Sequence, residues 1–318
     1  MQKNVNNATL YGEFYIMPFS GYENVKFLVL IGISITYLSS MMGNVTITLL
    51  VCLVQQLHTP MYFFLCNLSV QDMVYVSNIQ PKLLAILITD DTRISFSGCI
   101  TQIFLFTFCI DTEFFLLTSM AYDRFVAICK PLHYNIIMNK RTCSLLTCTC
   151  WIAAASNGFL FSLITSNLPF CKSHDIYHFF CEVETMLALT CTDTTYIFRI
   201  IFVEGFVIGI SPLLLIVTSY VFIISSIMKI QTSSGRLKMF SSCSSHLTTV
   251  LLLYGTSMGS YMKIESELSS KQNEWVSMFY LVLVPMLNPL VYSLRNKDVM
   301  KAIKSLTDRC WSLNERKA

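Results

Sequence analysis

Seven runs of mainly apolar residues follow one another along the chain, and only short polar connections separate them. A helix needs about 20 apolar residues to cross the ~30 Å hydrocarbon core of a bilayer, and each run reaches that length. The first, fourth and seventh runs contain no Asp, Glu, Lys or Arg. The pattern predicts an all-α membrane protein, a bundle of seven transmembrane helices without a separate soluble domain. The runs cover residues 27–54, 61–80, 94–122, 142–169, 200–228, 239–262 and 275–294.

The distribution of Lys and Arg predicts the orientation of this bundle. These residues gather in alternate connections and in the C-terminal tail, and they favour the cytoplasmic side of a membrane. We therefore expect an extracellular N-terminus over residues 1–26, a transmembrane domain over 27–296 and a cytoplasmic tail over 297–318. A short amphipathic helix should follow the seventh span. Asn7 begins a glycosylation motif on the expected outer side.

Composition excludes an ordinary soluble domain. Only 13% of the residues are charged, whereas soluble domains carry about 25%. The net charge of +3 is a sign of topology and gives no evidence for nucleic-acid binding. A transporter would often show an internal repeat, and none is visible. The enzyme motifs His-Glu-x-x-His and Gly-x-Ser-x-Gly are absent from the sequence, so we do not expect an enzyme.

The thirteen cysteines divide between the two sides of the membrane. Nine fall in spans or near the cytoplasm, where thiols stay reduced. Cys99, Cys171, Cys181 and Cys191 are expected outside, and four cysteines allow three pairings. An alternative is a zinc or copper site, because the spacing Cys-x2-His-x3-His-x2-Cys over residues 171–181 suits metal ligands. Oxidation of Cys181 with Cys99 would remove one of those ligands.

Several polar residues lie inside the predicted spans, where they are costly to bury. Asp72 and Glu113 are either protonated or share a cation or a proton. Proline inside a helix, such as Pro289, removes a backbone hydrogen bond and permits a kink. Asn288 could reach either the carbonyls freed in this way or Asp72. Asp123 and Arg124 end the third run, either as an ion pair that anchors the helix or as a latch that releases Arg124 to a partner.

Four long sequence motifs resemble those of olfactory receptors, a family of rhodopsin-like G-protein-coupled receptors. They are LHTPMYFFLCNLS at 57–69, MAYDRFVAICKPLHY at 120–134, SSCSSHL at 241–247 and PMLNPLVYSLRN at 285–296. The resemblance implies a multi-pass receptor of the plasma membrane that binds a small volatile or semi-volatile odorant. It also implies a stimulatory, olfactory-type G protein as the partner, which raises cAMP.

The same resemblance implies roles for individual residues. It pairs Cys99 with Cys181 and Cys171 with Cys191, and it places a sodium ion near Asp72 and Glu113, with no other cofactor. The implied activation switch consists of Asp123, Arg124, Tyr220, Asn288, Pro289 and Tyr292.

Residues three or four positions apart share a helix face, and this spacing selects a candidate ligand pocket in the outer half of the bundle. Asp111 departs from the small or hydroxyl residues common in the family, and Glu204 is also unusual. If these carboxyl groups are ionised, they favour an amine ligand. If they are protonated, they can donate a hydrogen bond to a carbonyl group of the ligand. Alternatively, either acid faces water or another helix. The predicted pocket comprises Phe106, Thr107, Ile110, Asp111, Glu204, Ile208, Tyr254, Ser257, Met258, Tyr261, Met278 and Leu281.

Overall fold

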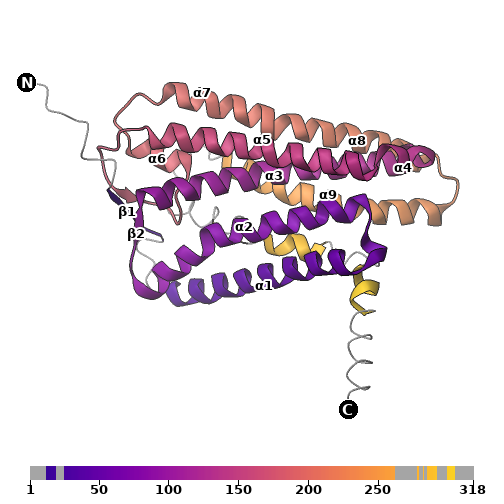
Figure 1. Cartoon of the computed structure of the whole chain (residues 1–318), viewed down its shortest axis with the longest axis horizontal. Coiled ribbons are helices and arrows are strands. Elements are labelled where there is room, and N and C mark those ends of the chain that lie inside the picture. The colour runs from indigo at the N-terminus through magenta and orange to yellow at the C-terminus, as the bar shows by residue number, and fades with distance from the viewer. Residues whose placement is uncertain are drawn as a thin grey trace, which may run out of the picture.

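The computed structural model describes residues 12–18, 25–261, 278, 282, 285–291 and 299–304, and this part of the chain is mainly helical (Figure 1). Of the residues predicted above, Asn7, Leu281 and Tyr292 lie outside the described ranges. The side chains of Met258 and Tyr261 also lie outside them.

Long helices lie side by side along the longest axis of the molecule (Figure 1). Among the described residues, α1, α3, α5 and the continuous segment Thr195–Met228 are long and apolar enough to cross a membrane. The 28 residues of α1 extend about 42 Å at 1.5 Å per residue, more than a bilayer core requires. The long elements are α1 (Lys26–Leu53), α2 (Pro60–Thr89), α3 (Phe96–Cys129), α5 (Lys140–Ser166), α7 (Thr195–Glu204), the π-helix η4 (Gly205–Ile210), α8 (Ser211–Met228) and α9 (Ser233–Tyr261).

Two helices continue well past the apolar runs that predicted them. Helix α2 extends beyond Gln80 to Thr89 and contains Pro81. Helix α3 extends seven residues beyond Tyr122, which places Asp123 within the helix rather than at its end. The apolar runs underestimate both helices because backbone hydrogen bonding continues wherever packing supports it, whether or not a residue is charged.

A small three-stranded sheet covers one end of the bundle (Figure 1). Its central strand β1 (Glu13–Ile16) pairs antiparallel with β2 (Arg93–Ser95) and parallel with β3 (Asp175–Ile176). Phe14 and Ile16 point into the protein and are almost fully buried. The short helix α6 (Val183–Leu189) lies at the same end. Burial of these side chains stabilises strands that are too short to persist alone.

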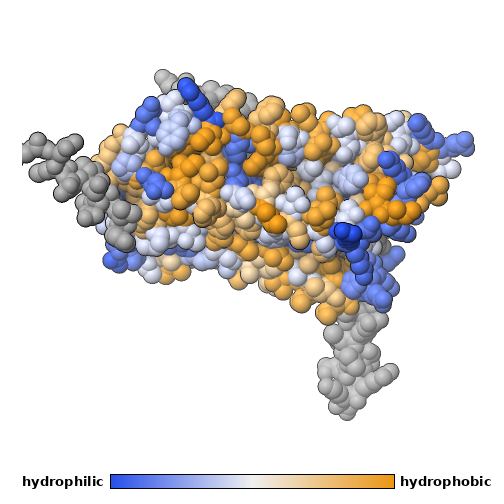
Figure 2. All heavy atoms as spheres, turned by 45° about the horizontal axis from the view of Figure 1, so that its top comes forward, coloured by the Kyte–Doolittle hydropathy of each residue, from blue (hydrophilic) through white to orange (hydrophobic). Residues whose placement is uncertain are grey.

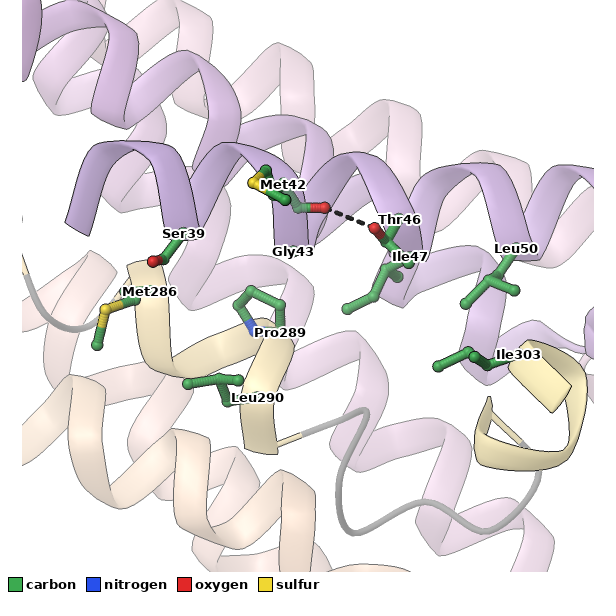
Figure 3. A pocket seen from close by; sticks show the side chains of 10 residues that line it. All are labelled: Ser39, Met42, Gly43, Thr46, Ile47, Leu50, Met286, Pro289, Leu290 and Ile303. Atoms are coloured by element: carbon green, nitrogen blue, oxygen red, sulfur yellow. Dashed lines mark hydrogen bonds between the residues drawn. The ribbon is translucent and has the colours of Figure 1, made fainter. Parts of the chain in front are cut away.

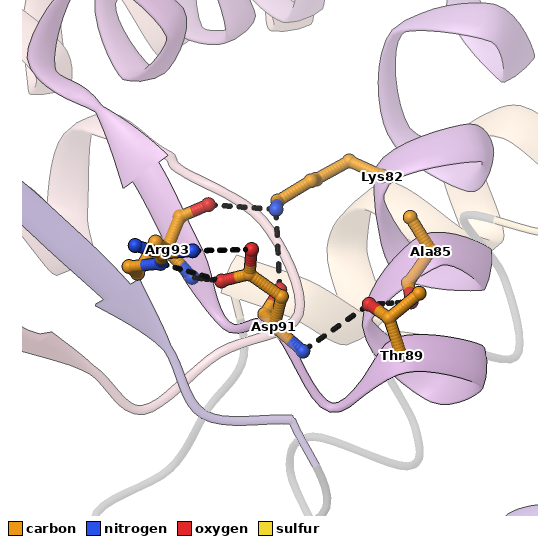
Figure 4. A network of polar contacts seen from close by, with 5 residues as sticks. All are labelled: Lys82, Ala85, Thr89, Asp91 and Arg93. Carbon is orange, nitrogen blue, oxygen red and sulfur yellow. Dashed lines mark hydrogen bonds and ion pairs between the residues drawn. The ribbon is translucent and has the colours of Figure 1, made fainter.

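A polar network fixes the turn between α2 and β2 (Figure 4). The Arg93 guanidinium contacts both oxygens of Asp91, at 2.8 and 2.9 Å, and holds the pKa of that carboxyl well below its usual range. Lys82 donates to the backbone oxygens of both residues. Asp90, which pairs with Lys26, ends α2 in the left-handed conformation. The network holds β2 where β1 can pair with it.

Helix α3 lies in the interior and packs against α2, α5 and α8. Gly158 of α5 allows a close approach, because a Cβ there would lie 3.0 Å from the Phe104 oxygen of α3. Small residues commonly allow such contacts between membrane helices.

The outer faces of the helices are apolar. Figure 2 shows hydrophobic residues over much of the visible face and hydrophilic residues mainly toward its two ends. Exposed side chains such as Leu214, Val217 and Phe222 of α8 suit contact with lipid. The end opposite the sheet carries the remaining short elements, η2 (Gln55–Leu57), η3 (Pro131–His133) and α4 (Tyr134–Ile137).

Candidate functional site

Two disulfides stabilise the connection between α5 and α7 at the sheet end, and one of them ties it to α3. Cys99, in the first turns of α3, is bonded to Cys181 with a Cα–Cα distance of 5.4 Å. Cys171 is bonded to Cys191 with a Cα–Cα distance of 5.9 Å. Both pairs are those that the family resemblance implied.

These bridges remove the alternative metal site at residues 171–181, since both of its cysteines are oxidised. Within the described ranges, His, Cys, Asp and Glu side chains form no group of three or more suited to a metal. The loop is held further by Gln102 of α3, whose side-chain oxygen accepts from the Cys181 backbone N–H at 2.8 Å. The sequence pattern did not identify Gln102 as a residue that contacts this loop.

A buried polar cluster joins α2, α3 and the segment 285–291. The Asn288 amide donates to Asp72 at 3.1 Å and to Glu113 at 3.2 Å. Asp72 is 1% exposed and Glu113 is 4% exposed. The predicted contact between Asn288 and Asp72 is therefore present. The Asn288 side-chain oxygen is buried without a hydrogen-bond partner, so the cluster offers an uncommitted oxygen ligand beside two carboxyl groups.

Helix α1 is attached to the same segment through residues that the sequence did not single out. The Ser40 hydroxyl donates to the Pro285 carbonyl at 3.1 Å, and the Asn44 amide donates to the Ser40 carbonyl at 3.0 Å. Both side chains are buried. Asn44 stands in a glycosylation pattern within an apolar run, so its sequence context gave no indication of this structural role.

A second acid cluster occupies the contact of α3, α5 and α7. The Asn157 amide donates to Asp111 at 2.8 Å and to Glu204 at 3.1 Å. Asp111 is 2% exposed, and Glu204 is half-buried. The two acids therefore meet through a residue of a third helix, and Asn157 was absent from the predicted site.

The π-helix η4 begins directly after Glu204. Such widened turns occur often at functional sites. The Tyr254 hydroxyl donates to the Gly209 carbonyl in this segment at 3.2 Å, and its ring lies 5.0 Å from that of Phe114. Tyr254 thus connects α9 with η4 and α3.

The other predicted pocket residues are distributed around these contacts. The Phe106 ring lies 4.8 Å from Phe180 and 6.0 Å from Tyr75, directly beneath the loop that carries Cys181. The half-buried members are Phe106, Thr107, Ile110, Ile208, Ser257 and Met278.

At the end opposite the sheet, Asp123 accepts a hydrogen bond from the short helix α4. The Tyr134 hydroxyl donates to Asp123 at 2.7 Å, so the first residue of α4 is attached to α3. Asp123 is 1% exposed. Tyr134 is the last residue of the motif MAYDRFVAICKPLHY, but the sequence analysis assigned roles in this motif only to Asp123 and Arg124.

Tyr220 of α8 belongs to a network with α9 and α3. Its hydroxyl lies 2.8 Å from His246 Nδ1, and His246 Nε2 lies 2.9 Å from the Leu117 carbonyl. A carbonyl only accepts, so Nε2 carries a proton, and in the neutral imidazole Nδ1 accepts from the Tyr220 hydroxyl. The same hydroxyl also lies 3.3 Å from the Cys243 carbonyl. His246 is 2% exposed and fastens α9 to the middle of α3.

Comparison of the sequence with known proteins shows the family of this chain. The family model described as "Olfactory receptor" matches residues 33–309. Olfactory receptor 5AR1 of Mus musculus is 45% identical over 302 residues, which cover 94% of this chain and 97% of the relative. Its Homo sapiens counterpart is 44% identical over the same shares. Olfactory receptor 2B6 of Mus musculus is 43% identical over 95% of this chain and 97% of its own length. The chain therefore belongs to the olfactory receptor family, whose members are seven-transmembrane G-protein-coupled receptors and not enzymes.

Proposed function

We propose that this chain is an odorant receptor of the plasma membrane, which binds a small volatile or semi-volatile ligand and activates a stimulatory, olfactory-type G protein. The observation that carries the proposal is the course of α3. This helix begins at the disulfide of Cys99, passes both acid clusters and ends beside the Asp123–Tyr134 contact. A ligand that shifts α3 at one end would change the surface at the other.

The proposed ligand region lies around Asp111 and Glu204. Both oxygens contact the same nitrogen of Asn157, at 2.8 and 3.1 Å, so they are no more than about 6 Å apart. Two ionised carboxylates at that separation repel each other by about 3 kcal/mol at an effective dielectric constant of 20. A cationic group relieves this repulsion. The cluster therefore favours ligands that carry an amine over uncharged ligands of the same shape.

A sodium ion near Asp72 and Glu113 is part of the proposal. Hard cations prefer oxygen ligands, and the cluster supplies two carboxyl groups and the unpartnered oxygen of Asn288. These residues would hold the ion, which would balance their negative charge. The ion would thereby steady the contact between α2, α3 and the segment 285–291.

The proposed G-protein surface is the end of the bundle that holds η3 and α4. Leu132 is 92% exposed and Ile136 is 71% exposed, and both stand next to Tyr134, which is fixed to α3. The exposed Lys130 and Lys140 add positive charge. Apolar anchors within a basic rim suit an acidic partner, because complementary charge guides its approach.

The test is ligand-evoked cAMP in cells with and without the stimulatory Gα subunit. We expect a response to at least one member of a panel of amines, alcohols and aldehydes matched in carbon number, and its loss without Gα. Asp111→Asn with Glu204→Gln should weaken amine responses at least ten-fold and leave alcohol responses unchanged. Ion currents that persist without Gα would instead show a channel. An unchanged ligand spectrum in the double variant would refute the amine preference.

A further inference from the structure

A cavity of about 360 Å³ lies between α1, the segment 285–291 and the helical segment 299–304 (Figure 3). Its volume falls within the range of small-molecule pockets, about 300–1,000 Å³. Met42, Leu290 and Ile303 provide apolar walls from the three segments. The Thr46 hydroxyl, also in the wall, donates to the Met42 carbonyl at 2.7 Å, so it is already satisfied within its own helix.

The base of this cavity depends on a glycine. A Cβ at Gly43 would lie 2.9 Å from both Cβ and Cγ of Pro289, closer than carbon atoms normally approach. Any larger residue would push α1 away from the segment 285–291. Gly43 therefore allows the two segments to touch at one level, and the cavity occupies the space beside that contact.

The cavity opens toward the lipid-facing side of the bundle. Met42, in its wall, is 70% exposed, and its neighbours on α1, Leu38 and Leu49, are 58% and 52% exposed. The lining of α1 runs from Ser39 to Leu50, about 17 Å of helix, and stops three residues before α1 ends at Leu53. This region lies inside the membrane, where an apolar cavity is filled by hydrocarbon rather than by water.

Two exposed lysines lie on the helical segment 299–304, which supplies Ile303 to the cavity wall. In this segment, Val299 and Ala302 are buried and Ile303 is half-buried, whereas Lys301 and Lys304 are exposed. The segment thus directs one apolar side chain into the cavity and carries positive charge at positions 301 and 304. Basic residues at the cytoplasmic surface attract anionic headgroups.

We propose that this cavity binds one acyl chain of an anionic phospholipid from the cytoplasmic leaflet, with the headgroup on Lys301 and Lys304. The assignment rests on the orientation proposed above. The bound chain contacts α1 and Pro289 together. It therefore strengthens the attachment of the segment whose Asn288 holds Asp72 and Glu113.

The experiment uses the full-length receptor in nanodiscs of phosphatidylcholine with 10% of a phosphatidylserine that carries a diazirine on one acyl chain. After photolysis, peptide mass spectrometry locates the adducts. We expect them on the peptide containing residues 39–50, with competition by unlabelled phosphatidylserine and not by phosphatidylcholine. Met42→Trp, which fills the opening without touching the Gly43–Pro289 contact, should lower the adduct at least five-fold. Leu38→Trp, on the exposed face beside the cavity, is the matched control.

The headgroup contact is tested separately. Lys301→Gln and Lys304→Gln should each lower the adduct about five-fold, the effect of one lysine near an anionic surface. Lys229→Gln, at the exposed end of α8, should leave it unchanged. Adducts spread equally over α1 and α8, equal competition by phosphatidylcholine, or cross-links to a second copy of the chain would each overturn the proposal. Ligand-evoked cAMP of the same variants distinguishes failure of the lipid proposal from failure of the proposed receptor function. A receptor that signals but is not labelled selectively refutes only the lipid site.

Discussion

The contact of Asn157 with Asp111 and Glu204 gives the sharpest prediction, because one amide serves two acids on different helices. In Asn157→Ala, both carboxyl groups lose their shared donor, at 2.8 and 3.1 Å. Hydrogen bonds to charged groups contribute about 1.5–3 kcal/mol each. Glu204 is only half-buried, so its share is reduced by solvent. We expect Asn157→Ala to lower the free energy of unfolding by about 2–4 kcal/mol.

For a chain of this length, such a loss lowers the melting temperature by on the order of 3–6 °C, which thermal unfolding of the detergent-purified receptor measures directly. Ser156→Ala is the matched control. Ser156 is the exposed neighbour of Asn157 on α5, and its hydroxyl donates only to the Ile152 carbonyl of its own helix. This control should melt within about 1 °C of the parent, because exposed substitutions away from special features usually change stability by less than about 0.5 kcal/mol.

A double-mutant cycle isolates the contact from general loss of packing. In the background Asp111→Asn with Glu204→Gln, removing the Asn157 amide should cost about 1 kcal/mol, the net value of an ordinary hydrogen bond. The difference between the two backgrounds should therefore reach about 1–3 kcal/mol. Equal losses in both backgrounds, or an unchanged melting temperature in Asn157→Ala alone, would show that the amide does not support the acids.

Three further predictions concern the two ends and the middle of α3. Tyr134→Phe removes the donor to buried Asp123, so maximal ligand-evoked cAMP should fall several-fold at equal surface expression, and an unchanged maximum would contradict this. His246→Ala removes the side-chain donor that joins α9 to the Leu117 carbonyl of α3. Loss of this contact weakens the attachment of α9 to α3 by about 1–3 kcal/mol, so ligand-free cAMP should rise. A ligand-free cAMP level equal to that of the parent would contradict this. Cys99→Ala opens a disulfide of sequence separation 82, against 20 for Cys171→Ala. Chain entropy assigns these bridges about 4.5 and 3.3 kcal/mol, so surface expression should fall further in Cys99→Ala, and the reverse order would refute the entropic argument.

The candidate site was only partly visible in the sequence. Asp72, Glu113 and Asn288 could be selected because polar residues inside apolar runs are costly and therefore conspicuous. Their partners Ser40 and Asn44 were not selected, since small polar residues in membrane helices carry little cost and often bond only to their own backbone. Asn157 is the clearest omission: it is an uncharged residue within a run without charge, and only the approach of α3 and α7 gives it a role.

The sequence by itself determined the membrane-spanning helices, since their length and apolarity follow from bilayer thickness and need no knowledge of neighbours. It also identified the acidic residues, the cysteines and the motif MAYDRFVAICKPLHY, within which α3 ends. Tertiary structure decided which of these groups meet. Asp111 and Glu204 stand 93 positions apart, and they share Asn157 only because α5 packs against α3 across Gly158. Strand β1 likewise forms only because it pairs with β2 and β3. Spacing along the chain reports the face of a single helix, whereas contacts between helices depend on packing that no local pattern contains.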